Sequence, residues 1–250
     1  MHILLTNDDG IYAPGILALH AQLAKIAKVT VVAPDSERSS IGHAITLAHP
    51  LFARKINRQK KFFGYGLSGT PADCVKFAVG VLLKRKPDLV ISGINLGPND
   101  GCSVFYSGTV AGAREGAISG IPSIAVSLGT FTNPTFDAAA RFTAKLAKIV
   151  IKNKLPKNTF LNVNVPNQKM SAIKGVRIAR QGKVPIHGQF KKNTDPSGRA
   201  HYWMFGEVRG IEKNLDVDTY ALSKNFVSVV PIQCDSTDHG FLPQLKSWKF

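Results

Sequence analysis

Apolar runs and helical patterns alternate along the first two thirds of the chain. Short, mostly apolar segments with the length of buried parallel strands lie at 2–6, 29–34, 87–93, 123–127 and 159–166. Between them, apolar residues recur at helical spacing, most clearly over 16–26 and 136–152. Strands that alternate with helices form right-handed crossover units, so the pattern predicts a mostly parallel sheet.

Local signals predict three further elements. Thr70 can cap a helix, Pro71 suits its first position and Asp73 its first turn, so a helix is expected from residue 71. A second helical pattern covers 109–119. Residues 45–65 have the pattern of antiparallel strands separated by turns, and we expect them to form a flap beside the main sheet.

The character of the chain changes after residue 166, where glycine, proline and polar residues separate short strand-like segments. The segments 219–223 and 226–232 have the pattern of a hairpin. The predicted fold class is therefore α/β, with a doubly wound, Rossmann-like and mostly parallel sheet. We assign residues 1–165 to this core and residues 166–250 to a β-rich C-terminal appendage.

Composition narrows the class of protein. In 250 residues, 44% of them hydrophobic, no run of eighteen apolar residues occurs, and no basic leader precedes the first strand, so neither a membrane span nor a signal peptide is expected. The three cysteines are odd in number and lack the C-x-x-C spacing. This argues against a disulfide framework or a zinc site and favours a reducing, cytoplasmic location.

The charge balance points to anionic partners. Lysine and arginine number 32 against 16 acidic residues, a net charge of +16, which attracts nucleotides, polyphosphate or nucleic acid. The basic residues form separate clusters near 54–61, 84–86 and 191–192, and they are not interleaved with aromatic residues as in RNA-binding motifs. Nucleic acid is therefore not expected to be the main partner.

Polar residues follow the predicted strands at their carboxyl ends. Asp8 and Asp9 come directly after the first strand, Ser39 follows the second and Asn95 the third. Ligands of open parallel sheets bind at this edge. Taken alone, the two aspartates could form a turn, or they could bind a divalent cation such as Mg²⁺ or Mn²⁺, which prefers oxygen ligands.

Residues 95–116 are a candidate phosphate-binding segment. Ser107, Gly108 and Thr109 precede a helical pattern, where free N–H groups attract phosphate, and Asn99 lies nearby. An ordinary loop with a helix cap is the alternative. The segment has neither the Walker sequence nor the dinucleotide fingerprint.

The segment 36–43 offers two more candidates. Ser39 lacks the G-x-S-x-G context of a nucleophile, so its hydroxyl is better interpreted as a ligand to a metal or phosphate. His43 could be a general acid, but we favour a hydrogen-bonded loop histidine.

Five motifs in order, "ILLTNDDGIYAPG", "VVAPDSERSSIGHAIT", "GTPADCVKFAV", "PDLVISGINLGPN" and "YSGTVAGAREG", resemble the SurE survival-protein family. The resemblance covers about residues 2–128 and resumes at "LNVNVP" and "FVSVVPI". It implies a metal-dependent phosphatase that releases phosphate from nucleoside 5′- and 3′-monophosphates and from short polyphosphate. Cys102 and Ser103 stand where many relatives have an acidic residue.

Residue roles follow from the resemblance by motif. Asp8, Asp9, Ser39 and Asn95 would bind the cation, with Asp8, Asp9 and Asn95 catalytic, and Ser107–Thr109 would hold the phosphate. The C-terminal part would exchange elements between the subunits of a homodimer or homotetramer.

Two alternatives concern the chemistry. Asp8 or Asp9 could orient or deprotonate the attacking water, or one of them could form an aspartyl-phosphate. Haloacid-dehalogenase-like phosphatases also place aspartates after the first strand, but they need D-x-D, and here the two acids are adjacent.

Overall fold

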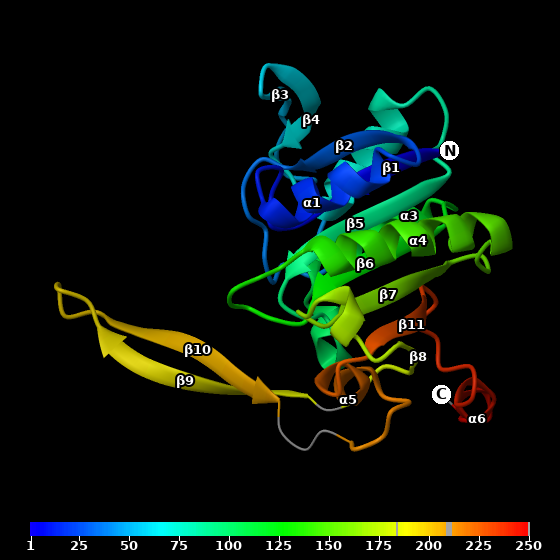
Figure 1. The fold of residues 1–250 in the computed structure, drawn as a ribbon. Coiled ribbons are helices and arrows are strands. Elements are labelled where there is room, and N and C mark those ends of the chain that lie inside the picture. Colours follow the sequence, from blue (N-terminus) through cyan, green and yellow to red (C-terminus); the bar gives the residue numbers. More distant parts are fainter. Residues whose placement is uncertain (184, 209–211, 250) are drawn as a thin grey trace.

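The computed structural model describes residues 1–183, 185–208 and 212–249. A nine-stranded sheet runs through these residues in the order β3-β4-β2-β1-β5-β6-β7-β11-β8, and β9 and β10 form a separate two-stranded sheet (Figure 1). The strands of the large sheet are β1 (His2–Thr6), β2 (Lys28–Pro34), β3 (Ala53–Arg58), β4 (Lys61–Leu67), β5 (Leu89–Leu96), β6 (Ser123–Leu128), β7 (Thr159–Val165), β8 (Val176–Ile178) and β11 (Val227–Gln233). Those from β4 to β7 run parallel, which confirms the α/β, doubly wound fold class.

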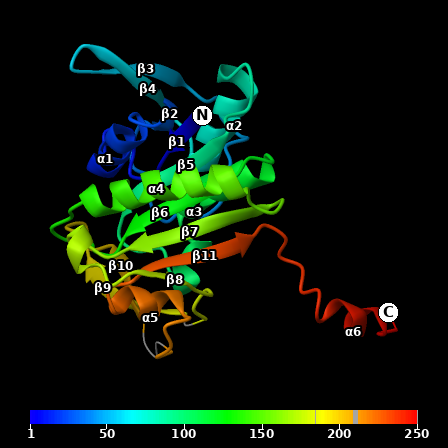
Figure 2. The same cartoon turned by 45° about the vertical axis from the view of Figure 1, so that its right-hand side comes forward.

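Helices cover both faces of this sheet. They are α1 (Pro14–Leu23), α2 (Pro71–Phe77), α3 (Gly108–Ile118), α4 (Asp137–Asn153), α5 (Asp218–Ser223) and α6 (Leu242–Lys246), with a π-helix at Ala78–Leu82 and 3₁₀ turns at Gly101–Phe105 and Met170–Ala172. The pair α1 and α4 packs on one face and the pair α2 and α3 on the other (Figure 2). No helix in the described ranges is long and apolar enough to cross a membrane.

The first strand shows why the core forms around it. All five residues of β1 are buried. Ile3 and Leu5 pack into the cluster beneath α1 and α4, whereas Leu4 packs into the cluster beneath α2. A strand that buries both faces must be almost wholly apolar, which is the pattern seen in the sequence.

The order of the strands reverses at β1. The chain passes from β1 to β2 and β4 on one side, then returns to β5 on the other side of β1. The carboxyl ends of β1 and β5 therefore flank the crevice in which open α/β sheets bind ligands.

One predicted strand is wrong. The segment 219–223 belongs to helix α5, and its supposed partner is β11, which pairs with β7 and β8 instead. Five residues are too few to separate helical from strand periodicity. The local bonds favour the helix, because Asp218 accepts hydrogen bonds from the N–H groups of Thr219 and Gly182, both at 2.8 Å.

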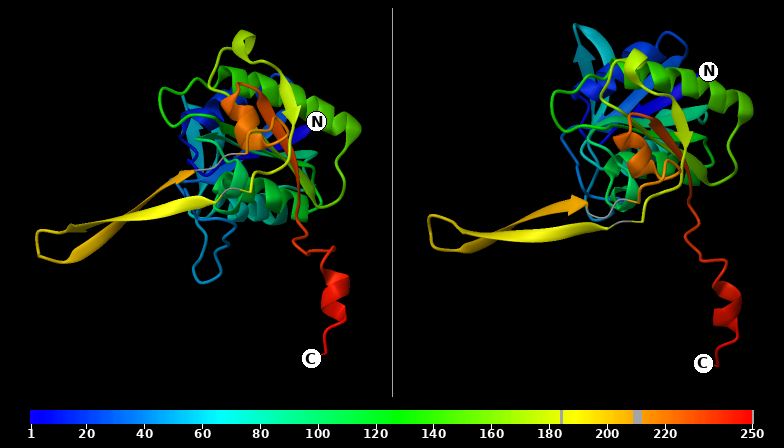
Figure 3. Two further views of the ribbon diagram at one scale, coloured as in Figure 1. Left: turned by 90° about the horizontal axis from the view of Figure 1, so that it is seen from below. Right: turned by 60° about the horizontal axis from the view of Figure 1, so that its bottom comes forward.

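The hairpin of the C-terminal part lies elsewhere, in β9 (Ile186–Thr194) and β10 (Ala200–Val208). It extends away from the sheet as a long ribbon, and α6 stands apart at the end of a strap (Figure 3). The antiparallel pair β3 and β4 forms the expected flap, although β4 also joins the sheet through β2. The boundary at residue 165 remains a prediction, and β8 and β11 from beyond it join the main sheet.

A buried carboxylate joins three segments beside the sheet. Glu115 of α3 lies 2.9 Å from His43 Nε2 and 3.0 Å from Lys76 Nζ on α2. Burial alone would raise the pKa of Glu115, but the hydrogen bonds and charges of His43 and Lys76 outweigh it, so the pKa is lowered.

We expect Glu115→Gln to lower the free energy of unfolding at neutral pH by about 1–3 kcal/mol. A glutamate with a lowered pKa in the folded state stabilises the protein above its unfolded pKa, and this stabilisation is lost as the pH falls through the folded-state pKa. In urea denaturation over a pH series, the free energy of unfolding of the variant should therefore fall less steeply with decreasing pH than that of the parent, which gives a flatter acid limb.

The matched control is Arg141→Gln, which removes the exposed ion pair with Asp137. It should change the free energy of unfolding by less than about 1 kcal/mol. An acid limb of unchanged slope in Glu115→Gln would contradict the assigned pKa shift.

Candidate active site at the strand ends

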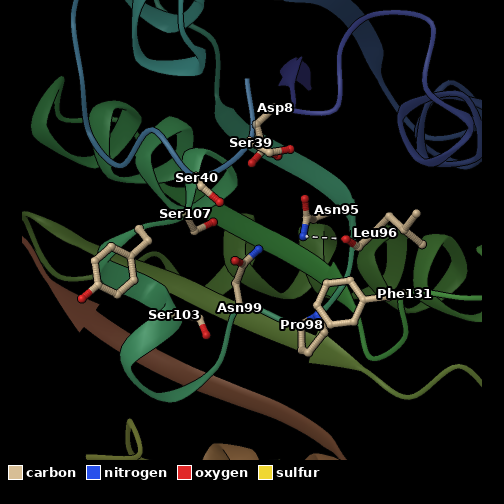
Figure 4. A pocket seen from close by; sticks show the side chains of 11 residues that line it. Asp8, Ser39, Ser40, Asn95, Leu96, Pro98, Asn99, Ser103, Ser107 and Phe131 are labelled. Atoms are coloured by element: carbon tan, nitrogen blue, oxygen red, sulfur yellow. Dashed lines mark hydrogen bonds between the residues drawn. The ribbon is translucent and has the colours of Figure 1, made fainter. Parts of the chain in front are cut away.

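A pocket of about 230 Å³ opens at the carboxyl ends of β1 and β5 (Figure 4). It is lined by Asp8, Ser39, Ser40, Asn95, Leu96, Pro98, Asn99, Ser103, Tyr106, Ser107 and Phe131. The predicted ligands Asp8, Ser39 and Asn95 thus meet in one pocket, at the position that the strand order indicates.

The turn after β1 fixes Asp8. Asn7 Nδ2 donates to the carbonyl of Gly10 at 2.8 Å, and Gly10 has φ +97°, which favours glycine. The carboxylate of Asp8 is 3% exposed and accepts a hydrogen bond from the hydroxyl of Thr109. The carbonyl of Asp8 accepts from the N–H of Arg38 at 2.8 Å, which ties the loop after β2 to the same point.

Asp9 lies in an adjoining hollow with Ser39, Glu37 and Leu96. Its Oδ2 accepts a hydrogen bond from the N–H of Leu96 at 3.1 Å. Burial, and then the charge of Asp8, raise the pKa of Asp9 to about 7.

Burial also raises the pKa of Asp8, against the hydrogen bond from Thr109, which lowers it. Both carboxylates are therefore costly to hold as anions without a cation nearby.

The side chain of Asn95 is oriented by its amide nitrogen. Nδ2 donates to the carbonyls of Gly97 at 2.7 Å and Leu96 at 3.3 Å. The Oδ1 atom then faces the side of the pocket on which Asp8 and Ser39 lie (Figure 4). The register with β6 shifts between Ser92 and Asn95, and irregularities of this kind re-aim side chains at strand ends.

Ser39 is exposed at the mouth of both hollows. Its hydroxyl donates to Glu37 Oε1 at 2.7 Å, which leaves the oxygen lone pairs available to a ligand. The guanidinium of Arg38 points elsewhere, with its Nη2 3.3 Å from the carbonyl of Ser68.

The predicted phosphate-binding residues take different places. Ser107 caps α3 by accepting from the N–H of Val110 at 3.1 Å, and it lines the pocket together with Asn99. Gly108 and Thr109 lie against Asp8 and are not among the residues that line the pocket. The first turn of α3 nevertheless leaves N–H groups that no carbonyl within the helix can accept.

Asn99 is held by a polar network. Its N–H donates to Asn164 Oδ1 and its Nδ2 to Ser127 Oγ, both at 2.8 Å, and its carbonyl accepts from Asn162 Nδ2 at 2.7 Å. Its Oδ1 remains free to face the pocket.

His43 lies away from the pocket, against Glu115, as expected for a loop histidine. The sequence interpretation did not include Tyr106, Leu96, Pro98 or Phe131 among the site residues. Leu96 and Pro98 follow Asn95 directly and could have been inferred from their position. Phe131 had only a weak signal, namely an aromatic residue shortly after the end of a predicted strand.

The donors suit a hard cation. Within the described ranges, no group of three or more His, Cys, Asp or Glu side chains is placed to hold a metal ion. The set here is two carboxylates, one amide oxygen and one hydroxyl, all of them oxygen donors, which fits Mg²⁺ or Mn²⁺ better than zinc. No lysine or arginine lines the pocket in the part of the chain that the structure describes.

Comparison with known proteins gives consistent relatives. The family model described as "Survival protein SurE" matches residues 3–187. A protein named 5′-nucleotidase SurE from Desulfatibacillum aliphaticivorans is 50% identical over 249 residues, covering 100% of this chain and 98% of its own. Another protein of the same name, from Thermosipho africanus, is 48% identical over 246 residues, covering 98% of this chain and 96% of its own.

A solved structure shares the fold. The SurE protein from Aquifex aeolicus superposes with a TM-score of 0.86 at 42% identity, over 98% of each chain.

We expect Gly108→Ala to disturb the site, because a Cβ there would lie 2.8 Å from the Cβ of Asp8 and 3.2 Å from the carbonyl of Arg38. The start of α3 would have to move off the buried Asp8. The free energy of unfolding should fall by about 1–3 kcal/mol in thermal or urea denaturation.

Gly80→Ala is the matched control, since a Cβ at Gly80 meets nothing within 4 Å. This variant should be as stable as the parent or more stable by up to about 1 kcal/mol. Equal stability of the two variants would show that Gly108 is not needed for close packing on Asp8.

Proposed function

The chain belongs to the SurE family, and from this membership and the geometry of the strand-end pocket we propose that it is a metal-dependent 5′-nucleotidase. It hydrolyses nucleoside 5′-monophosphates to nucleosides and phosphate. Nucleoside 3′-monophosphates and short polyphosphate complete the proposed substrate range.

One observation carries the proposal. The pocket holds the buried carboxylate of Asp8, with Asp9 beside it, and no basic side chain among the described residues that line it. A phosphate dianion would be repelled by such a site. A divalent cation held by these carboxylates would remove this conflict, because it would neutralise their charge and also attract the phosphate.

The residues that would hold the cation are Asp8, Asp9, Ser39 and Asn95. A bound Mg²⁺ or Mn²⁺ would supply charge neutralisation at the phosphate and a lowered pKa for a water molecule. The free oxygen of Asn95 and the raised pKa values of the two aspartates support this assignment.

The chain itself provides the rest of the chemistry. The N–H groups at the start of α3 and the hydroxyl of Ser107 bind phosphate oxygens and stabilise them as they gain charge. Asn99 lies beside Ser107 in the pocket and adds polar atoms. Asp8 or Asp9 orients the attacking water or takes its proton. A covalent aspartyl-phosphate is the alternative for the same carboxylates.

AMP hydrolysis should stop on addition of EDTA and return with Mn²⁺ or Mg²⁺, and Asp8→Asn should lower kcat/KM by about 10²–10⁴. Asn95→Ala should lower it as well, because it removes the free amide oxygen. Phosphate release from AMP measures all three effects.

The control for Asn95→Ala is Asn153→Ala, an exposed asparagine on α4 that bonds the carbonyl of Ile149. It should retain full activity. Activity that survives EDTA would refute the metal-dependent mechanism, and salt-sensitive RNA binding without hydrolysis would favour the nucleic-acid alternative. Borohydride reduction during turnover would convert an aspartyl-phosphate at position 8 or 9 to homoserine and so distinguish the covalent mechanism.

We also propose that the chain forms a homodimer or homotetramer through the β9–β10 hairpin and α6. The hairpin carries large side chains that are mostly exposed, namely Phe190, Tyr202, Trp203, Met204 and Phe205. Four of them are consecutive on β10, and because successive side chains of a strand point to opposite faces, they occupy both faces of the ribbon. A two-stranded ribbon with apolar residues on both faces is marginally stable alone, so a partner surface would stabilise it.

The cytoplasmic location of the protein remains a prediction.

The double variant Trp203→Ser, Met204→Ser should reduce the molar mass in light scattering, because it removes apolar contact area from both faces of the hairpin. Phe62→Ser is the control, since Phe62 is a similarly exposed aromatic residue on the β3–β4 hairpin. A monomeric parent protein, or a double variant of unchanged mass, would contradict the proposed interface.

A further inference from the structure

The walls of the pocket differ in chemistry from side to side. Ser39, Ser40, Ser103 and Ser107 present hydroxyls, whereas Leu96, Pro98 and Phe131 present carbon atoms. Figure 4 shows these three residues on one side of Asn95, with Ser40 and Ser107 on the other. We refer to Leu96, Pro98 and Phe131 as the apolar wall.

Phe131 is the largest part of the apolar wall. Its side chain is 71% exposed although it belongs to the loop between β6 and α4, next to a well-packed core. The ring rests on Gly97, where a Cβ would lie 2.1 Å from ring atom Cε1. Since Gly97 accepts the hydrogen bond that orients Asn95, the ring is seated on the same short loop that aims a predicted ligand.

The ring also borders the second hollow, with Asp9, Glu37 and Ser39. It therefore stands between the two carboxylate-bearing hollows. A single exposed aromatic residue is ordinary on a protein surface. One that is wedged against the backbone at the rim of a polar pocket is placed to meet the organic part of a ligand.

We propose that the apolar wall is the nucleobase subsite, with the base stacked on the ring of Phe131. This inference rests on the proposed function, in which the phosphate lies at the polar side, near Asn99 and Ser107. Aromatic rings bind nucleobases through their faces, and this contact tolerates every base because each has a π-face.

The apolar wall also predicts how the base is recognised. Leu96, Pro98 and Phe131 have no side-chain donor or acceptor that could read the edge of a base. Discrimination among bases should therefore follow ring size rather than exocyclic groups, and purines should gain more from the subsite than pyrimidines.

Tyr106 offers a competing platform. It is 58% exposed, lines the same pocket and precedes Ser107 directly. It lies among the serines, so a base stacked there would crowd the proposed phosphate position. The two aromatic residues can be compared directly by substitution.

The test compares AMP with ribose 5-phosphate, which has the same phosphorylated sugar but no base. The ratio of their kcat/KM values measures the contribution of the base. In Phe131→Ala this ratio should fall by about 5- to 100-fold, mostly through the KM for AMP. Phe131→Tyr keeps the ring and should retain most of the ratio.

Phe105→Ala is the matched control, because Phe105 is 62% exposed and does not line the pocket. Its ratio should equal that of the parent. The inference is overturned if Phe131→Ala keeps the parent ratio, if Tyr106→Ala alone lowers it, or if Phe131→Ala impairs both substrates equally. A parent protein that hydrolyses neither substrate would refute the proposed function itself, which is a different result from any of these.

Discussion

The contact between Asp8 and the first turn of α3 determines how the strand ends are arranged. Thr109 donates to the buried carboxylate, and Gly108 lies so close that no side chain would fit there. The carbonyl of Asp8 accepts from Arg38, so the loop after β2 is fixed at the same point. One residue thus holds the ends of β1 and β2 to the start of α3, and burial raises the pKa of its carboxyl group.

A second polar network links the loop of the pocket to β7 and to α5 in the C-terminal part. Asp218 of α5 accepts from the N–H of Gly101 at 2.9 Å and from that of Gly182 at 2.8 Å. Asn99 is bonded to Asn162 and Asn164 on β7. The loop that lines the pocket is therefore fastened to strands and a helix that come much later in the chain.

The sequence predicted what depends on local chemistry. Thr70 caps α2 as expected, Asp73 lies in its first turn, and the mostly apolar segment at 2–6 is a wholly buried strand. Proximity of Asp8, Ser39 and Asn95 followed from the rule that parallel strands end at one edge. Helix α5 was missed because the helical conformation depends on hydrogen bonds from Gly101 and Gly182 to Asp218. The spacing of apolar residues along the chain gives no sign of these long-range bonds. Phe131 was missed for a similar reason, since its place depends on a contact with Gly97, which follows the neighbouring strand β5.

The charges of this protein attract anions at long range but repel them at short range, near the aspartates of the site. The net charge of +16 raises the concentration of anions around the whole molecule. Asp8 in the pocket and Asp9 in the adjoining hollow repel the same anions, and the nearest arginine in sequence, Arg38, is turned toward Ser68. We therefore expect a phosphate that is attracted to the surface to gain little at the site until a cation is present. Under the proposed function, this arrangement makes phosphate binding conditional on the metal, which a pocket lined with lysines would not do.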